Sequence, residues 1–335
     1  MAYDKELAAA IKAASLAARL CRKVQKALLQ SDVRSKHGRN KSPVTVADYG
    51  SQALVSFVLQ QEFPGEFSLV AEEDSNDLRK DGDGEIVERI AKLVNESLTS
   101  DGSYGVSLSS EDVLKAIDSG KSEGGSQGRH WVLDPIDGTK GFVRGDQYAV
   151  ALALLDRGNV VLGVLACPNL PLTSISVAHP HSPNNEVGCL FFAEVGRGTY
   201  MQPLDGSSTV KVVSAVENPE EASFFESYEA AHSMHDLSSL IAQVKYGALS
   251  RGDGDIYLRF PRNGYREKIW DHAAGSIVVT EAGGVVTDAA GKQLDFSKGK
   301  YLDLDTGIIV SNQKLMPLLF DAVRASVAQK SKPQP

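Results

Sequence analysis

The segment Asp134-Pro135-Ile136-Asp137-Gly138-Thr139 limits what this chain can fold into more than any other part of the sequence. It follows a short apolar run, residues 131–133, of the kind that forms a buried strand. Pro135 lacks a backbone donor and has a fixed φ, so we expect the strand to break there and a turn to follow. Gly138 lets the backbone come close to a phosphate. The segment therefore predicts two carboxylates held on a rigid turn.

Three more carboxylates lie at the ends of expected helices or strands. Glu72 closes an apolar strand over residues 67–70, Asp271 follows an Ile-Trp pair at the start of a helix, and Asp48 lies in the first turn of another helix. Since the core fixes the backbone at such ends, the side chains can converge. Mg²⁺ prefers oxygen ligands. The sequence therefore predicts a magnesium site, beside the Thr139 hydroxyl, from these ligands: Glu72, Asp134, the Ile136 carbonyl, Asp137 and Asp271.

Each acidic residue taken alone also has a purely structural interpretation. Asp48 could stabilise a helix dipole, and Asp271 could be an N-cap. Glu72 belongs to an acidic triplet that could be a solvated loop, while Asp134 and Asp137 could bond to the backbone of their own turn. All of these interpretations would have to hold together for the site to be absent, so the set favours a metal centre.

The order of expected elements predicts an α/β fold with two domains. Two helices come first, over residues 5–29 and from Thr45 to just before Pro64. We expect a surface insertion at about residues 78–129, carrying a helix around residues 86–98 and another near Val113. Apolar β runs then predict an antiparallel meander, at residues 148–155, 160–166, 174–178, 189–193 and 210–213. Later elements are expected at residues 271–282 (helix), 285–287 and 308–310 (strands) and 314–327 (helix). We place the domains at residues 1–213 and 214–335.

Composition and charge exclude several classes of function. The net charge of −8, without a basic stripe, argues against nucleic-acid binding. The sequence contains no run of about 18 apolar residues, the length that a membrane-spanning helix needs. The N-terminus has no secretory or transit signal, so we expect a soluble intracellular, cytoplasmic protein; an organellar location is compatible with a removed leader. The three cysteines form no C-x-x-C pair and are expected to be reduced thiols; Cys167 and Cys189 lie on β runs that could pair.

Several motifs together match a known group of enzymes. They are Pro43-Val44-Thr45-Val46-Ala47-Asp48, Val70-Ala71-Glu72-Glu73-Asp74-Ser75, Trp131 to Thr139, Trp270-Asp271-His272-Ala273-Ala274-Gly275 and Glu281-Ala282-Gly283-Gly284. The chain resembles, over nearly its whole length, the lithium-sensitive, magnesium-dependent phosphatases that include inositol monophosphatase and fructose-1,6-bisphosphatase. Within them it is most similar to the plant 3′(2′),5′-bisphosphate nucleotidases, through Ala231-His232-Ser233, Lys245-Tyr246, Tyr257-Leu258-Arg259 and the insertion after Glu73.

The resemblance implies a fold and a role for each site residue. The fold would be a layered α-β-α-β-α sugar-phosphatase fold, with an antiparallel-sheet domain and a smaller α/β domain. Two to three Mg²⁺ ions would be held by the ligands given above, with Li⁺ as an inhibitor. Asp48, through Thr139, would take a proton from the attacking water. The Gly138 and Thr139 amides would bind the phosphate, together with Asp271, and the nucleotide would contact three further residues: His232, Lys245 and Arg259.

The implied reaction is hydrolysis of the 3′-phosphate of adenosine 3′,5′-bisphosphate and of 3′-phosphoadenosine 5′-phosphosulfate. Inositol 1,4-bisphosphate is a further substrate to expect, so the partner is a small phosphorylated nucleotide or an inositol phosphate, and the chain could act as a monomer or a dimer. The alternatives are an inositol monophosphatase-like sugar-phosphate phosphatase and a catalytically weakened, ligand-binding relative.

One segment departs from the subgroup. Before Lys245 this chain is shorter by roughly fifteen residues, and Ile241 and Ala242 lie where the subgroup has Asp and Ser. The strand that normally ends there would be missing. We therefore expect an intact metal site beside an altered nucleotide pocket.

Overall fold

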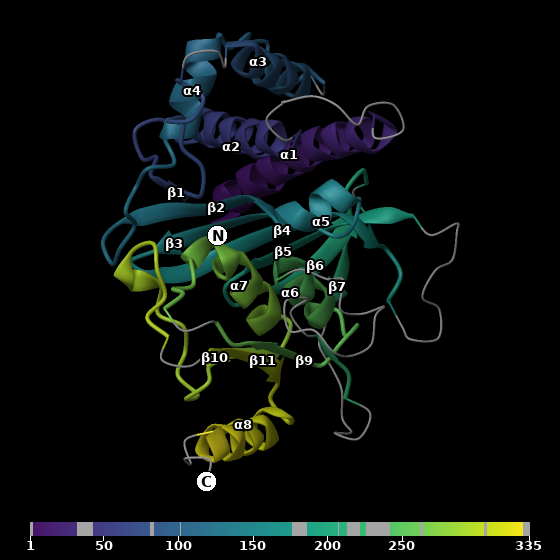
Figure 1. Ribbon diagram of the computed structural model, residues 1–335, viewed down its shortest axis with the longest axis vertical. Coiled ribbons are helices and arrows are strands. Elements are labelled where there is room, and N and C mark those ends of the chain that lie inside the picture. Colours follow the sequence, from purple (N-terminus) through teal and green to yellow (C-terminus); the bar gives the residue numbers. More distant parts are fainter. Residues whose placement is uncertain are drawn as a thin grey trace.

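The computed structural model describes residues 3–31, 43–80, 84–100, 102–175, 186–206, 208–212, 222–225, 242–261, 264–304 and 307–330. Figure 1 shows these residues as alternating layers: helices, a large sheet, a second pair of helices, a smaller sheet and a last helix. This arrangement confirms the predicted layered α/β fold. Among the described residues, no helix is long and apolar enough to cross a membrane.

The large sheet has seven strands in sequence order, β1 to β7. Only the pair β1–β2 is parallel; every later pair is antiparallel. The predicted meander is therefore confirmed, with β6 as a strand that the sequence analysis missed. Of the strand expected at residues 174–178, residues 174 and 175 lie in no strand, and the others lie outside the described residues. The strands are β1 (Leu69–Ala71), β2 (Arg129–Asp137), β3 (Ala149–Asp156), β4 (Asn159–Pro171), β5 (Val187–Glu194), β6 (Gly198–Pro203) and β7 (Val210–Val212).

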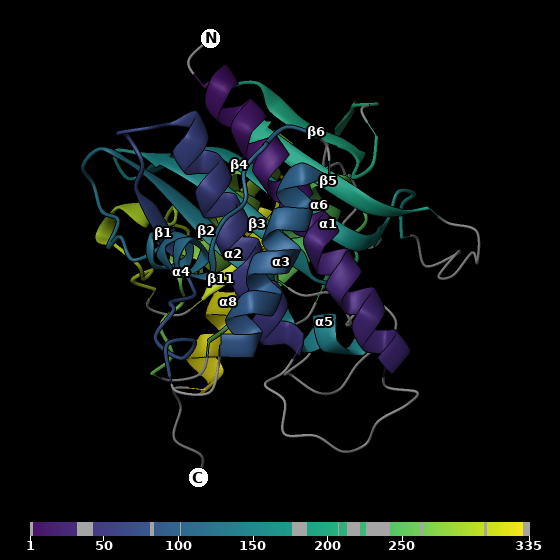
Figure 2. The same ribbon diagram turned by 90° about the horizontal axis from the view of Figure 1, so that it is seen from above.

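Four helices cover one face of this sheet, and Figure 2 shows the longest of them crossing over the strands. They are α1 (Asp4–Ser31), α2 (Pro43–Glu62), α3 (Gly84–Thr99) and α4 (Ser110–Asp118), and a short helix, α5 (Thr139–Arg144), follows β2. α3 lies outermost, but it buries one face against the core through Val87, Ile90 and Val94. The expected surface insertion is thus an outer helical layer whose buried side chains form part of the hydrophobic core.

The smaller sheet has the order β10-β11-β9-β8, in which β8 and β9 are parallel. Helices α6 and α7 lie between the two sheets, and α8 lies beyond the smaller one (Figure 1). The elements are β8 (Phe224–Phe225), α6 (Ala242–Ser250), β9 (Ile256–Arg259), α7 (Ala273–Glu281), β10 (Gly284–Asp288), β11 (Ile308–Asn312) and α8 (Met316–Lys330), with 3₁₀ turns at Ile269–Asp271 and Phe296–Lys298. Residue 213, the expected domain boundary, lies outside the described residues, and the two-domain division stays a prediction.

The antiparallel pairing of β4 and β5 places Cys167 directly opposite Cys189. Both side chains are buried and both are free thiols. Burial raises the pKa of Cys189 to about 11, despite the opposing charge of Arg251. Because the thiolate is the reactive form, the pair is protected from rapid oxidation at neutral pH.

We expect a strong oxidant to link Cys167 to Cys189 slowly and to reduce turnover by stiffening the sheet. Mass mapping should find the linked peptide in oxidised wild type and in Cys21→Ser. It should be absent from Cys189→Ser. If no linked peptide forms in the wild type, the opposition of the two residues has no redox consequence.

Candidate active site

The Asp134–Asp137 segment is a β-bulge, which corrects the strand break expected at Pro135. β2 continues to Asp137, and its register with β3 shifts between Asp134 and Asp137. Strand β1 pairs with β2 only as far as Leu133. Beyond that point β2 has a single neighbouring strand, so a proline without a donor is tolerated.

The bulge decides where the two carboxylates point. In a regular strand, residues 134 and 137 would face opposite sides of the sheet, because successive side chains alternate. Here Asp134 pairs with Ala151 and Asp137 with Ala149, which are two residues apart on β3. The extra residue therefore brings both carboxylates to the same face.

Neighbouring groups hold this bulge in place. Ser51 Oγ, on α2, donates to the Pro135 carbonyl at 3.0 Å, and the Ile136 amide donates to Asp134 Oδ1 at 3.0 Å. Gly138 then turns the chain into α5 with φ of 91°, a left-handed conformation that favours glycine. The carboxylates are consequently placed by a rigid backbone.

The structure brings the predicted acidic residues within electrostatic reach of one another. Burial raises the pKa of Asp134 well above its usual range, and the carboxylates of Glu72, Asp137, Asp271 and Asp48 raise it further. Burial, Asp137 and then Glu72 also raise the pKa of Asp271. Glu72 is the most exposed of the five, yet the atoms packed around it and the charge of Asp137 raise its pKa as well. A bound cation would relieve this repulsion.

Two basic side chains face the same cluster. Burial raises the pKa of Asp137; a backbone hydrogen bond from Gln243 opposes this rise, followed by the charges of His272, Arg259 and Lys245. Lys245 is only 2% exposed and its Nζ lies 5.2 Å from the centre of the Tyr257 ring. The alternative interpretation of Lys245 as a solvated surface charge is therefore wrong. Of the two, Arg259 is partly open to solvent, with 26% of its side chain exposed, whereas Lys245 adds positive charge from a buried position.

Helix α6 begins directly at the site. The backbone amide of Gln243 donates to Asp137 Oδ2 at 2.6 Å, and the side-chain amide of Gln243 donates to the Trp270 carbonyl at 2.7 Å. Ala242 is the first residue of this helix, while Ile241 and the predicted nucleotide contact His232 lie outside the described residues. The residues after the shortened segment are thus joined to the acidic cluster.

Asp48 is 5% exposed on α2, and burial followed by the charges of Glu73 and Glu72 raises its pKa well above normal. One turn later, Gln52 exchanges hydrogen bonds with the Glu73 backbone, at 2.6 Å as donor and 3.0 Å as acceptor. Sequence reasoning missed Gln52, although a polar residue four positions after Asp48 on an apolar helix was a usable signal. Gln52 fixes the loop after β1 against the helix that carries Asp48.

Thr139 is placed at the end of the bulge, as the sequence predicted. Its Oγ1 lies 3.4 Å from the Ile136 carbonyl oxygen. The hydroxyl therefore faces the same carbonyl that is expected to be a metal ligand. Its proton transfer to Asp48 stays a prediction.

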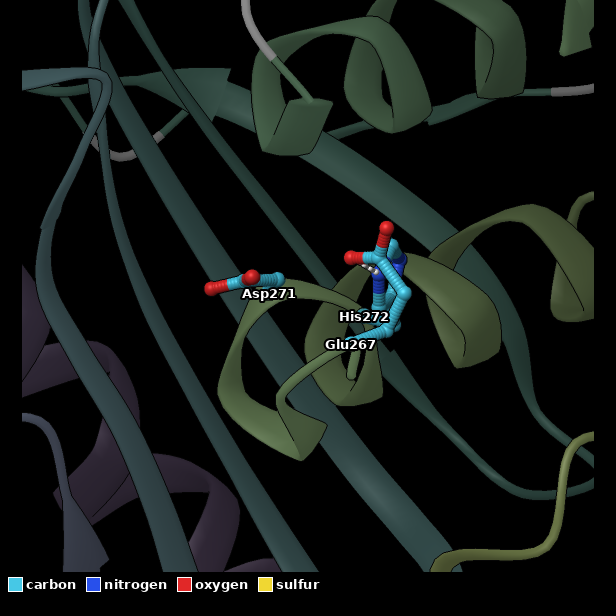
Figure 3. Close-up of side chains that lie close together, drawn as sticks. All are labelled: Glu267, Asp271 and His272. Carbon is cyan, nitrogen blue, oxygen red and sulfur yellow. Dashed lines mark hydrogen bonds and ion pairs between the residues drawn. The ribbon is translucent and has the colours of Figure 1, made fainter. Parts of the chain in front are cut away.

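The cluster fits a hard divalent cation. Its donors are all oxygens, from several carboxylates and a carbonyl, and burial followed by the charges of neighbouring carboxylates raises the pKa of the acidic members. Among the described residues, the acidic and histidine side chains whose donor atoms come close enough together to share an ion are Glu267, Asp271 and His272; the carboxylates of the predicted cluster do not all come that close. In Figure 3, however, Asp271 points away from the other two. Both ring nitrogens of His272 already have hydrogen-bond partners, so this group is a poor metal site.

A family model for the inositol monophosphatase family matches residues 6–328. The chain is 71% identical to 3′(2′),5′-bisphosphate nucleotidase 1 of Arabidopsis thaliana, covering 99% of each chain. It is 61% identical to 3′(2′),5′-bisphosphate nucleotidase of Oryza sativa, covering 98% of this chain and 96% of the relative. The alignment with the Arabidopsis relative extends over 351 positions against 335 residues here, which agrees with a shortened segment.

Solved structures of inositol monophosphatases share the fold. The enzyme from Zymomonas mobilis has a TM-score of 0.57 at 19% identity, covering 97% of this chain and 99% of the other. The enzyme from Anabaena (Nostoc) sp. PCC 7120 has a TM-score of 0.56 at 18% identity, covering 97% of each chain. At this identity the likeness shows the fold alone.

The raised pKa of Asp134 predicts a trade between stability and activity. A group whose pKa is raised in the folded protein stabilises the fold at pH values below its unfolded-state pKa, which is near 4 for an aspartate. This stabilisation is lost as the pH rises through the folded-state pKa. We therefore expect Asp134→Asn to melt at a higher temperature than wild type in chelator at pH 7, and to abolish turnover.

Added Mg²⁺ should raise the melting temperature of the wild type but hardly change that of Asp134→Asn. Glu123→Gln, at an exposed position, serves as the matched control and should follow the wild type. A folded Asp134→Asn variant with near-normal turnover would remove the cluster from the account.

Proposed function

The chain belongs to the inositol monophosphatase family, and from that premise we propose that it is a magnesium-dependent 3′(2′),5′-bisphosphate nucleotidase. Its substrates would be adenosine 3′,5′-bisphosphate and 3′-phosphoadenosine 5′-phosphosulfate, each losing its 3′-phosphate. One observation carries the proposal: the bulge in β2 turns Asp134 and Asp137 to one face of the sheet, within electrostatic reach of Arg259 on β9 and Lys245 on α6. A site that combines an acidic cluster with nearby basic side chains suits a substrate that has a second phosphate. The names of the two relatives at 71% and 61% identity support it.

The residues that would hold the metal follow from the cluster. Glu72, Asp134 and the Ile136 carbonyl would hold one Mg²⁺, and Asp134, Asp137 and Asp271 a second; a third, weaker ion would lie near Glu72. When bound, paired Mg²⁺ ions neutralise phosphate charge and make water more acidic. The bulge in β2 supports this assignment because it turns Asp134 and Asp137 to one face.

Asp48 and Thr139 would move the proton. A buried carboxylate with a raised pKa is a stronger base than an exposed one, which suits Asp48 as the final acceptor. Thr139 Oγ would receive the proton of the attacking water while passing its own to Asp48. The role of the protein is then to position these atoms and to balance charge, as phosphoryl transfer requires.

The phosphate groups would be recognised at two places. The amides of Gly138 and Thr139, at the start of α5, would bind the reacting phosphate beside Asp271. Lys245 and Arg259 would neutralise the second phosphate, and His232 would contact the base. An inositol bisphosphate could use the same two cations, so inositol 1,4-bisphosphate is the second candidate substrate.

Phosphate release decides among these functions. With Mg²⁺ we expect turnover of adenosine 3′,5′-bisphosphate, with weaker turnover of inositol 1,4-bisphosphate and inhibition of both by Li⁺. Preference for the inositol phosphate would reassign the substrate. No release from either compound would favour a weakened, ligand-binding relative, to which the shortened segment before Lys245 also points.

The proton relay predicts a separate loss of rate. Thr139→Val keeps the shape of the side chain but removes the hydroxyl, so kcat should fall by about 10²–10⁴-fold. Substrate binding should be retained, as measured by calorimetry. Thr280→Val, on α7, is the matched control, since its hydroxyl donates to the Ser276 and Ile277 carbonyls of its own helix. Wild-type kcat in Thr139→Val would make Thr139 a structural residue.

A further inference from the structure

A buried polar chain runs behind the two basic residues of the site. Glu267 is 1% exposed, and its Oε1 accepts a hydrogen bond from Arg259 Nε at 2.8 Å. Its Oε2 lies 3.1 Å from His272 Nε2, and His272 Nδ1 lies 3.0 Å from the hydroxyl of Tyr246. Figure 3 shows Glu267 and His272 side by side, with their contact dashed.

Two members of this chain are next in sequence to residues of the proposed site. Tyr246 follows Lys245 on α6, and His272 follows Asp271. Arg259 ends β9, and its side chain is 26% exposed, so part of the guanidinium remains open to solvent. Glu267 is the member of the chain that contacts both Arg259 and His272.

The arrangement of Arg259 has a physical requirement. Burial raises the pKa of Asp137 and of Asp271, and the guanidinium of Arg259 is among the charges that oppose this rise, so both carboxylates attract it. A flexible arginine there would pair with them and compete with a cation. The bond from Nε to Glu267 fixes one edge of the planar group, and the side chain remains 26% exposed, so an anion can approach it from solvent.

We propose that Glu267 is a positioning residue that orients Arg259 toward the second phosphate of the substrate and so sets the preference for bisphosphates. This inference rests on the proposed function. Glu267 acts through Arg259, and its link to His272 keeps Arg259 in register with Asp271. Both oxygens of Glu267 have hydrogen-bond partners, which fits a positioning role.

The test compares two substrates that differ by one phosphate. With adenosine 3′,5′-bisphosphate, Glu267→Gln should raise KM by about 10-fold, the loss of roughly one charge-assisted contact, and change kcat by less than about twofold. With adenosine 3′-monophosphate, KM should not change. Arg259→Lys should behave in the same way, and the double variant should lose little more than either single variant.

A second buried pair supplies the control. Arg251 Nε donates to Asp253 at 2.7 Å, and both side chains are at most 5% exposed, but the pair lies against Pro171 and Cys189. Asp253→Asn should lower the melting temperature without changing the ratio of the two KM values. If Glu267→Gln does not fold, Glu267→Asp, which keeps the charge, and Arg259→Lys carry the same test.

The outcomes separate the inference from the function beneath it. A wild type with equal KM for both substrates overturns the proposed second-phosphate site, and the inference falls with it. If the wild type has a lower KM for the bisphosphate than for the monophosphate, and a folded Glu267→Gln variant keeps the same ratio of KM values, the inference alone is overturned. Additive effects of Glu267→Gln and Arg259→Lys would also contradict it.

Discussion

Electrostatic repulsion among carboxylates that the backbone does not allow to separate is the constraint on which this structure depends. Asp134 is buried, and four other acidic side chains raise its pKa. Such crowding costs stability unless protons or cations neutralise it. The fold tolerates this cost because rigid elements hold the carboxylates in place: Asp134 and Asp137 on the bulge of β2, Asp48 on α2, Glu72 just after β1 and Asp271 just before α7. A site that is unfavourable when empty is correspondingly favourable for a divalent cation.

The layers around the site exist in part to maintain this geometry. Helix α2 contributes Asp48 and fixes the bulge through Ser51 and the loop after β1 through Gln52. From the opposite side of the sheet, α6 approaches Asp137 through the Gln243 amide. Two helical layers thus meet the same acidic cluster, which explains why its residues are scattered between positions 48 and 271.

The sequence predicted the layered fold and the members of the acidic cluster, because both depend on local patterns. Apolar periodicity marks the strands, and carboxylates at their ends mark the site. The prediction that Pro135 ends the strand was wrong. A proline is tolerated in β2 at this point because the neighbouring strand β1 has already ended, which the local sequence does not reveal. Lys245 was also beyond local pattern: its burial comes from packing between two sheets. The chain from Tyr246 to Arg259 was missed because its partners are distant in sequence and carry no motif.

Proton release on metal binding tests the central claim most directly. If the raised pKa values of Glu72, Asp134 and Asp271 reflect one cation site, Mg²⁺ must displace protons when it binds. Calorimetric titration of the metal-free protein with Mg²⁺, in two buffers of different ionisation enthalpy, measures that number. We predict saturable binding with net proton release near pH 6 that decreases as pH rises. Binding without proton release at any pH, or no binding at all, would contradict the account.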